Sequence, residues 1–216
     1  LASAVTRDKA VLKTVLTGLG IPVVRHMAFT RQEWVSTADA IVSRIESELG
    51  FPVFVKPASL GSSIGVARAK DAAELRTYVN IAANFDRRIL VEAAVEGAIE
   101  INCALMGNHD IRASVLEQPI TWQEFLTYEE KYMRGEGAAG MKGAERRIPA
   151  PISEELAARI RETAIRAFRA VDGRGTARVD FLVREETGEI FLNEINTMPG
   201  SLAFYLWQEE GMTPAQ

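Results

Sequence analysis

The feature that most restricts the fold is a change of hydrophobic pattern near the middle of the chain. From residue 99 to residue 105, apolar side chains alternate with Glu100, Asn102 and a small alanine. A period of two residues is typical of a half-buried antiparallel strand. A turn at 107–108 and a return strand over 111–116 are expected to follow. This part of the chain therefore needs an antiparallel sheet with one covered face and one polar face.

The remaining segments alternate between helical and extended patterns. Leucines, isoleucines and valines at helical spacing, followed by Gly or Pro, predict helices, and short apolar runs predict strands. The expected helices cover residues 7–19 (N-cap Thr6), 37–49, a segment from Asp71, and 153–171; the expected strands cover 53–55, 64–67, 89–91, 178–183 and 190–195. Residues 127–147, rich in glycine and charge, are expected to form a long loop. The chain then divides into two α+β lobes, residues 1–97 and 98–216.

Composition excludes several classes of function. The net charge of −4 gives no basic excess for holding nucleic acid or anionic lipid. The single cysteine, Cys103, excludes an internal disulfide and a cysteine-based zinc cluster, and two histidines disfavour a histidine-based triad. No apolar run approaches the 18 or so residues that a membrane span requires. A reducing, cytoplasmic setting is expected.

The hairpin over 178–195 carries the strongest chemical signal. If Leu182 pairs with Leu192, Asp180 lies opposite Glu194 on one face, and Asn196 points the same way. Opposed carboxylates repel unless a cation lies between them, and carboxylate and amide oxygens suit Mg²⁺. The alternative is a solvated polar face on which Arg178 neutralises Asp180.

Three further segments have weaker signals. Lys56 at a strand end precedes a loop with Gly61, Ser62 and Ser63, whose small residues let backbone N–H groups approach an anion; the alternative is a plain hairpin turn. Lys131, between two tyrosines of the long loop, predicts a lid over a nucleotide, or else a flexible surface loop. The extended segment from Val91 to Val95 is expected to contact adenine through its backbone, or else to be an ordinary linker.

These segments occur in an order that resembles the D-alanine–D-alanine ligases of the ATP-grasp superfamily. The matching motifs are Phe54-Val55-Lys56-Pro57, Leu60-Gly61-Ser62-Ser63-Ile64-Gly65-Val66, Leu90-Val91-Glu92 with Gly97 and Glu100, Tyr128-Glu129-Glu130-Lys131-Tyr132, Arg178-Val179-Asp180-Phe181, and Asn193 through Gly200. The resemblance covers nearly the whole chain and implies an ATP-grasp fold, with ATP in the cleft between the two lobes.

The resemblance also implies roles for individual residues. The implied nucleotide contacts are Lys9 and Lys56 (phosphates), Ser62 and Ser63 (the flap over them), Glu92, Ala93 and Val95 (adenine), Glu100 (ribose) and Lys131 (from the lid). The implied metal ligands are Asp180, Glu194 and Asn196, which hold two Mg²⁺ ions, or Mn²⁺ in their place. The implied catalytic residues are Ser62, Tyr132, Arg178 and Ser201, with Ser201 near the carboxylate of the second substrate.

The implied reaction joins two D-alanines through an acyl phosphate, for peptidoglycan precursors. The resemblance further implies an absent N-terminal domain, an end cut short beyond Gln216, and a homodimer for the whole protein. One departure is the Ser201–Trp207 segment, which differs from the best-known members and leaves the second substrate open. The alternatives are therefore a ligase that uses D-lactate, D-serine or another amino acid, and a module that only binds ATP.

Overall fold

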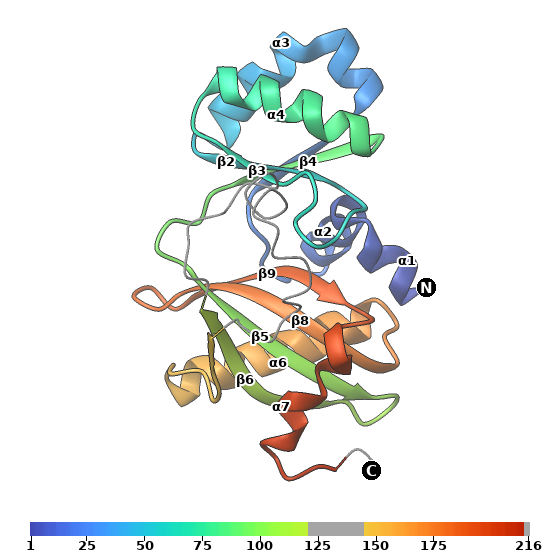
Figure 1. Ribbon diagram of the computed structural model, residues 1–216, viewed down its shortest axis with the longest axis vertical. Helices are drawn as coiled ribbons and strands as arrows, with labels where there is room; N and C mark the ends of the chain where they lie inside the picture. Colours follow the sequence, from blue (N-terminus) through green and yellow to red (C-terminus); the bar gives the residue numbers. More distant parts are fainter. Residues whose placement is uncertain (121–144, 214–216) are drawn as a thin grey trace, which may run out of the picture.

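The molecule is built from two α+β lobes, as the sequence predicted. The computed structural model describes residues 1–120 and 145–213. Each lobe has its own antiparallel sheet, and the lobes are stacked along the long axis of the molecule (Figure 1). Within the described residues, no helix has both the length and the apolar character that a membrane span needs.

The first lobe is a four-stranded sheet in the order β1-β4-β2-β3, with two helices over one face (Figure 1). Its elements are β1 (His26–Thr30), α3 (Arg31–Glu48), β2 (Val53–Pro57), β3 (Ala67–Ala69), α4 (Ala72–Phe85) and β4 (Arg88–Ala93). Val53 and Val55 of β2 are fully buried in the core with α3 and α4. Strand alternation therefore directs Lys56 to the opposite face, which looks toward the second lobe.

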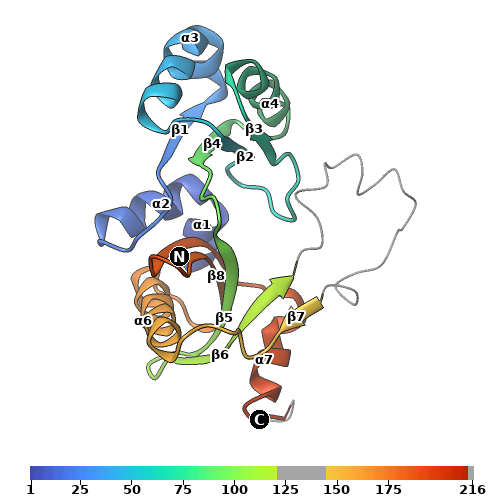
Figure 2. The same ribbon diagram turned by 90° about the vertical axis from the view of Figure 1, so that its left-hand side faces the viewer.

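The second lobe is a five-stranded sheet in the order β7-β6-β5-β8-β9. Its elements are β5 (Ile99–Gly107), β6 (Arg112–Ile120), β7 (Glu145–Arg147), α6 (Glu154–Ala170), β8 (Gly175–Arg184), β9 (Glu189–Asn196), the 3₁₀ turn η1 (Gly200–Ala203) and α7 (Phe204–Gln208). Helix α6 covers one face, and α7 lies on the other (Figure 2). Ile101 and Cys103 pack toward α6, so Glu100 and Asn102 belong to the face that carries α7.

Two short helices, α1 (Ala2–Arg7) and α2 (Lys9–Gly18), lie between the lobes (Figure 1). Leu12 and Leu16 of α2 are fully buried in the core of the second lobe. The side chain of Asp8, just before α2, is paired with Arg88 of the first lobe at 3.0 Å. Helix α2 therefore connects both lobes, while the expected division near residue 97 falls in the link between β4 and β5.

The structure differs from the expected helices at their starts. The segment 7–19 was expected to be one helix capped by Thr6. Instead Asp8 is extended and caps α2, because its carboxylate accepts from the N–H groups of Ala10 and Val11. Helix α3 begins at Arg31 rather than 37, since Thr30 and Glu33 form a capping box, and non-helical Thr37 interrupts it.

Three strands also differ from the sequence prediction. The strand expected over 64–67 is wrong, because turns run to Gly65 and β3 begins at Ala67. Strand β1 was not predicted, although it pairs with β4 along its whole length. Of the loop expected over 127–147, the last three residues form β7, which pairs with β6. The part up to residue 144 lies outside the described residues.

Candidate functional site

A cleft of about 560 Å³ lies between the two lobes and takes residues from both. Its lining brings together most of the charged and polar residues that the sequence singled out. They are Lys9, Lys56, Ser62, Ser63, Glu100, Arg178, Asp180, Glu194 and Asn196. Residues separated by up to about 190 positions in the chain therefore meet at one place.

The first-lobe wall of the cleft holds a buried glutamate between two lysines. Glu92 of β4 is 3% exposed. Its Oε2 is ion-paired with Nζ of Lys56, which lines the cleft. Its Oε1 is ion-paired at 2.5 Å with Nζ of Lys13, which is 1% exposed and comes from α2. Glu92 therefore joins the first sheet to the helix between the lobes.

Burial and charge act against each other in this cluster. Burial by itself would raise the pKa of Glu92, but Lys56 and Lys13 more than offset it and lower the pKa to about 2. Burial also lowers the pKa of Lys13, although Glu92 partly opposes that effect. With all three groups ionised, the cluster has one positive charge in excess.

The loop that covers this wall runs from Ser59 to Gly65 and has an unusual backbone. Ser62 and Ser63 adopt positive φ angles of 57° and 58°, and Gly65 has a φ of 70°. A Cβ on Gly65 would lie 2.8 Å from Cγ of Pro57, so only glycine fits there. The loop is anchored at its start, where the Ser59 N–H donates to Asp86 at 2.7 Å. The two exposed serines are thus held at the mouth of the cleft.

The opposite wall, on the second sheet, is acidic. Arg178 donates from Nε and Nη2 to both oxygens of Asp180, at 2.6 and 2.8 Å. Asn196 donates from Nδ2 to Asp180 at 2.8 Å and to Glu194 at 3.1 Å. The two carboxylates and the amide therefore lie close enough to share one cation, and a rotation of the amide would present its oxygen.

Burial, with a smaller effect of neighbouring carboxylates, raises the pKa values of acidic groups on this wall. Burial, reinforced by Glu194 and Glu100, raises the pKa of Asp180 to about 7, against the lowering effect of Arg178. Burial also raises the pKa of Glu100. A bound cation would favour the ionised form of both groups, so cation binding would stabilise the two carboxylates in this buried site.

The hairpin reaches this arrangement by a different register from the one expected. Asp180 does pair with Glu194, but Leu182 pairs with Phe191 instead of Leu192. A bulge at Asn193 absorbs the difference, and Asn193 itself lines the cleft. The predicted pairing of the carboxylates was therefore right, and the uniform ladder behind it was wrong.

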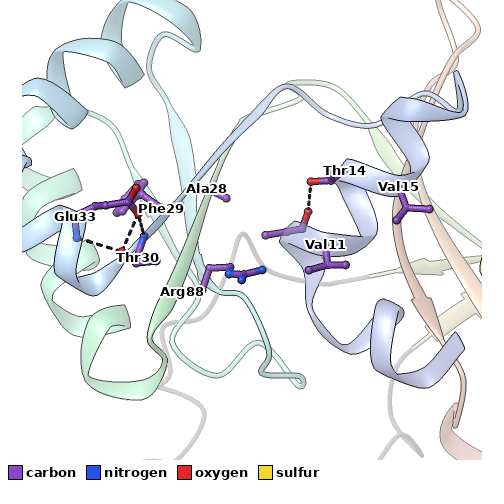
Figure 3. Close-up of a pocket in the computed structure, with 9 residues that line it drawn as sticks. Val11, Thr14, Val15, Ala28, Phe29, Thr30, Glu33 and Arg88 are labelled. Atoms are coloured by element: carbon purple, nitrogen blue, oxygen red, sulfur yellow. Dashed lines mark hydrogen bonds between the residues drawn. The ribbon is translucent and has the colours of Figure 1, made fainter. Parts of the chain in front are cut away.

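A second cavity, of about 310 Å³, lies between α2 and the first sheet (Figure 3). Arg88 extends across it from β4, and Val11 and Val15 line it from α2 (Figure 3). Its polar side chains already have partners: Arg88 pairs with Asp8, and Thr30 and Glu33 bond to each other. The lining otherwise consists mostly of small and apolar side chains, so we assign it no ligand.

The described residues offer no cation site that is made of His, Cys, Asp or Glu side chains alone. Among them, no group of three or more His, Cys, Asp or Glu side chains is placed to hold an ion. A cation in the cleft would thus depend on the amide of Asn196 together with Asp180 and Glu194. These oxygen donors suit a hard divalent ion such as Mg²⁺.

Comparison with known proteins identifies the family. Residues 15–216 match the family described as "D-ala D-ala ligase C-terminus". The chain belongs to the D-alanine–D-alanine ligase family.

Relatives within this family cover almost the whole chain. The D-alanine--D-alanine ligase of Acetivibrio thermocellus is 42% identical over 99% of the chain and 56% of its own length. The enzyme of that name from Deinococcus radiodurans is 45% identical over 93% of the chain and 57% of its own length. The chain thus spans about half the length of the curated relatives it matches.

Solved structures of D-alanine ligases agree with the fold. The VanG D-Ala:D-Ser ligase of Enterococcus faecalis superposes with a TM-score of 0.79 at 30% identity, over 93% of this chain and 55% of that one. The D-alanine-D-alanine ligase of Coxiella burnetii gives 0.76 at 29% identity, over 97% and 54%. The ATP-grasp fold expected from the sequence is confirmed.

Some residues to which the ligase resemblance gave roles lie away from the cleft lining. Ser201 is exposed in η1 with a φ of 50°, and the lining ends at Gly200. Ala93 is the last residue of β4, where its N–H donates to the Arg25 carbonyl, and Val95 follows in the link between the lobes. Lys131 and Tyr132 lie outside the described residues. The roles of these five residues stay predictions, as do those of the residues that line the cleft.

Lys13 is a residue that the sequence analysis overlooked. It is four positions after Lys9, so both lysines point from the same side of α2. The available signal was a charge next to the buried Leu12 and Leu16, since a buried cation requires a partner. That partner, Glu92, is 79 positions away, and the ligase resemblance had assigned it only to adenine.

Proposed function

We propose that the chain is the nucleotide-binding and catalytic part of an ATP-dependent D-alanine–D-alanine ligase that serves peptidoglycan precursor synthesis. The observation that carries this proposal is the opposition of charge across one cleft. Lys9 and Lys56 stand on one side with the serine loop, and Asp180 and Glu194 stand on the other. A nucleotide triphosphate with its divalent cation has the complementary arrangement of charge.

The donor set on the acidic wall fits Mg²⁺. Two carboxylates and one amide supply oxygen ligands. Burial, and to a smaller extent the nearby carboxylates of Glu194 and Glu100, raises the pKa of Asp180, so a cation beside it would be favourable. Asp180, Glu194 and Asn196 would hold the cation, which supplies positive charge beside the triphosphate oxygens. Two ions, and Mn²⁺ in place of Mg²⁺, belong to the same proposal.

The nucleotide itself would be held from both lobes. Lys9 donates to the carbonyl of Leu60 at 2.6 Å and lies 3.7 Å from Glu194, so its ammonium is already between the loop and the acidic wall. Lys9 and Lys56 would bind phosphate oxygens, with Ser62 and Ser63 as further donors. Among the described residues, nothing accepts from the N–H of Val95, which leaves that donor for adenine.

The chemistry needs positioning and positive charge more than a protein nucleophile. The carboxylate of the first D-alanine attacks the γ-phosphorus, the bond to ADP breaks, and an acyl phosphate forms. The amine of the second D-alanine then attacks the acyl carbon, and phosphate leaves. Arg178, which is partly buried and lines the cleft, would stabilise the oxygen charge that develops in both steps.

The remaining expectations are proposed for the whole protein. Lys131 and Tyr132 would close over the nucleotide, and Ser201 would contact the carboxylate of the second substrate. The N-terminal part of the whole protein would complete the site for the first D-alanine and contribute to a homodimer. Because ATP is the phosphoryl donor, we place the reaction in the cytoplasm.

The test is phosphate release from ATP by the complete gene product. D-Alanine, D-lactate, D-serine and L-alanine are supplied as second substrates beside D-alanine. We expect turnover that depends on D-alanine and Mg²⁺ and is lost in D180N. Turnover only with another second substrate would favour a ligase of different specificity, and nucleotide binding without turnover would favour a module that only binds ATP.

A further inference from the structure

Glu92 has two cationic partners, and these differ in how freely they can move. Lys56 lines the cleft and its side chain is 14% exposed. Lys13 is 1% exposed, and within the described part of the chain Glu92 holds the only carboxylate within 4.0 Å of its ammonium. One partner therefore faces the ligand space, and the other is enclosed.

The need for two partners follows from the cost of a lone buried charge. A buried carboxylate that loses its only cation is strongly destabilised. If Lys56 were the sole partner of Glu92, its ammonium could not leave for a phosphate without leaving Glu92 unpaired. With Lys13 in place, the carboxylate keeps one cation when Lys56 turns away.

We propose that Lys13 is a positioning residue, which stays paired with Glu92 and so releases Lys56 to bind the phosphates of the nucleotide. Lys13 itself does not touch the ligand. This inference rests on the proposed function, because it takes the cleft ligand to be a nucleotide polyphosphate. The inference adds Lys13 of α2, which is not one of the predicted nucleotide contacts, as the residue that keeps Glu92 paired when Lys56 binds phosphate.

The placement of Lys13 and Lys9 on one side of α2 supports the same conclusion. Lys9 lies at the cleft, where a phosphate can reach it, and Lys13 lies one turn deeper against Glu92. The helix is tied to the first lobe by Asp8 and Arg88 and to the second by its leucine core. Lys13 is therefore held in position whether or not Lys56 moves.

The experiment measures the affinity of the complete gene product for two probes in the presence of Mg²⁺: a non-hydrolysable ATP analogue and adenosine, which has no phosphate. K13M removes the charge while keeping most of the length. We expect K13M to weaken the ATP analogue about tenfold or more, with adenosine changed less than about threefold, since only phosphate binding needs Lys56. K13R, which keeps the charge, should restore most of the affinity for the analogue.

A second background separates this effect from a simple loss of positive charge near the phosphates. In E92Q no buried carboxylate holds Lys56. Adding K13M to E92Q should therefore cost less than about threefold in affinity for the analogue. An equal loss in the wild-type and E92Q backgrounds would overturn the proposal, because it would show a direct effect of charge.

Four other outcomes are informative. If K13M fails to fold by circular dichroism, K13Q replaces it, because its amide can still donate to Glu92 without a charge. A parallel loss of adenosine and analogue binding in a folded variant would show a merely structural role and overturn the proposal. A wild-type chain that binds neither probe would overturn the proposed function and this inference together, whereas normal binding by K13M would overturn this inference alone.

Discussion

The two walls of the cleft solve opposite problems with buried charge. On the first-lobe wall, one carboxylate, Glu92, is shared by two lysines, and its pKa falls to about 2. On the second-lobe wall, Asp180 has one strong cationic partner, Arg178, and faces two further carboxylates; its pKa rises to about 7. One wall thus has cations in excess and the other has carboxylates in excess.

The difference in net charge between the two walls indicates where the anionic and cationic parts of a ligand would bind. A surplus cation beside a satisfied carboxylate suits an anion, while a surplus of carboxylates suits a cation. Each wall keeps a net charge that a ligand of the opposite sign can balance. The comparison predicts that changes at the acidic wall act through metal, and changes at the basic wall act through phosphate and stability.

The largest effect is expected from D180N. Losing one carboxylate from the trio should weaken Mg²⁺-dependent binding of an ATP analogue by roughly 300-fold, or about 3.5 kcal/mol. Titrations with and without Mg²⁺ measure it. D172N is the matched control, because Asp172 is an exposed residue that pairs with Arg174 and is not part of the cleft lining. If D180N weakened binding of the analogue equally with and without Mg²⁺, the acidic wall would not act through the metal, and the contrast with the basic wall would be wrong.

E92Q tests the basic wall through the pH dependence of unfolding. Glu92 has a folded pKa of about 2, below its ordinary value of 4.5, so its stabilising effect is present above pH 4.5 and is lost as the pH falls toward 2. We expect wild type to exceed E92Q by up to about 3 kcal/mol at pH 6, with the difference vanishing near pH 2. Urea unfolding across this range measures it.

The control for E92Q is E48Q on the exposed Arg44–Glu48 pair of α3. Solvent screens that ion pair, so the unfolding free energy of E48Q should differ little from that of wild type at any pH. A difference between wild type and E92Q that persists unchanged down to pH 2 would show that the ion pairs of Glu92 are not its source.

Stabilisation by Mg²⁺ should also increase with pH, but over the higher range in which Asp180 ionises. Asp180 has a raised pKa, so without metal the stability it contributes at low pH is lost as the pH rises from 3.8 through about 7. A cation that favours the ionised form offsets this loss. At Mg²⁺ about tenfold above Kd, we expect Tm to rise by about 3–6 °C at pH 8 and by under about 2 °C at pH 5. Equal shifts at both pH values in thermal scans would contradict it.

The acidic wall could be predicted from the sequence more fully than the basic wall, for a physical reason. Asp180 and Glu194 lie on adjacent strands of one hairpin, so local alternation was enough to place them opposite each other. The bulge at Asn193 was not predictable, because both registers bury apolar residues. The prediction nevertheless held at the carboxylates, since the bulge lies between them and the turn.

The basic wall depends on packing between distant segments. Lys13 meets Glu92 only because α2 is seated against both lobes, and no local pattern reports that placement. The expected helix over 7–19 also concealed the cap at Asp8, which sets where α2 begins. The prediction of the first sheet lacked β1 for a similar reason. The short β1 segment includes a histidine and a threonine, and its strand structure depends on its pairing with β4.

The smallest expected effect comes from removing a helix cap. Comparing the caps of α2 and α4 separates the effect of the position of α2 on binding from the effect of losing any helix cap on stability. Asp8 caps α2 by accepting from Ala10 and Val11, and Asp71 caps α4 by accepting from Ala73 and Glu74. D8A and D71A should each cost about 1 kcal/mol of unfolding free energy.

Only D8A should also weaken binding of the ATP analogue, by about threefold, because α2 carries both Lys9 and Lys13 and loses its tie to Arg88. Paired measurements of urea unfolding and analogue affinity separate the two effects. If D71A weakened binding of the analogue as much as D8A, the general loss of stability would explain both results. The position of α2 between the two walls would then have no specific role in binding.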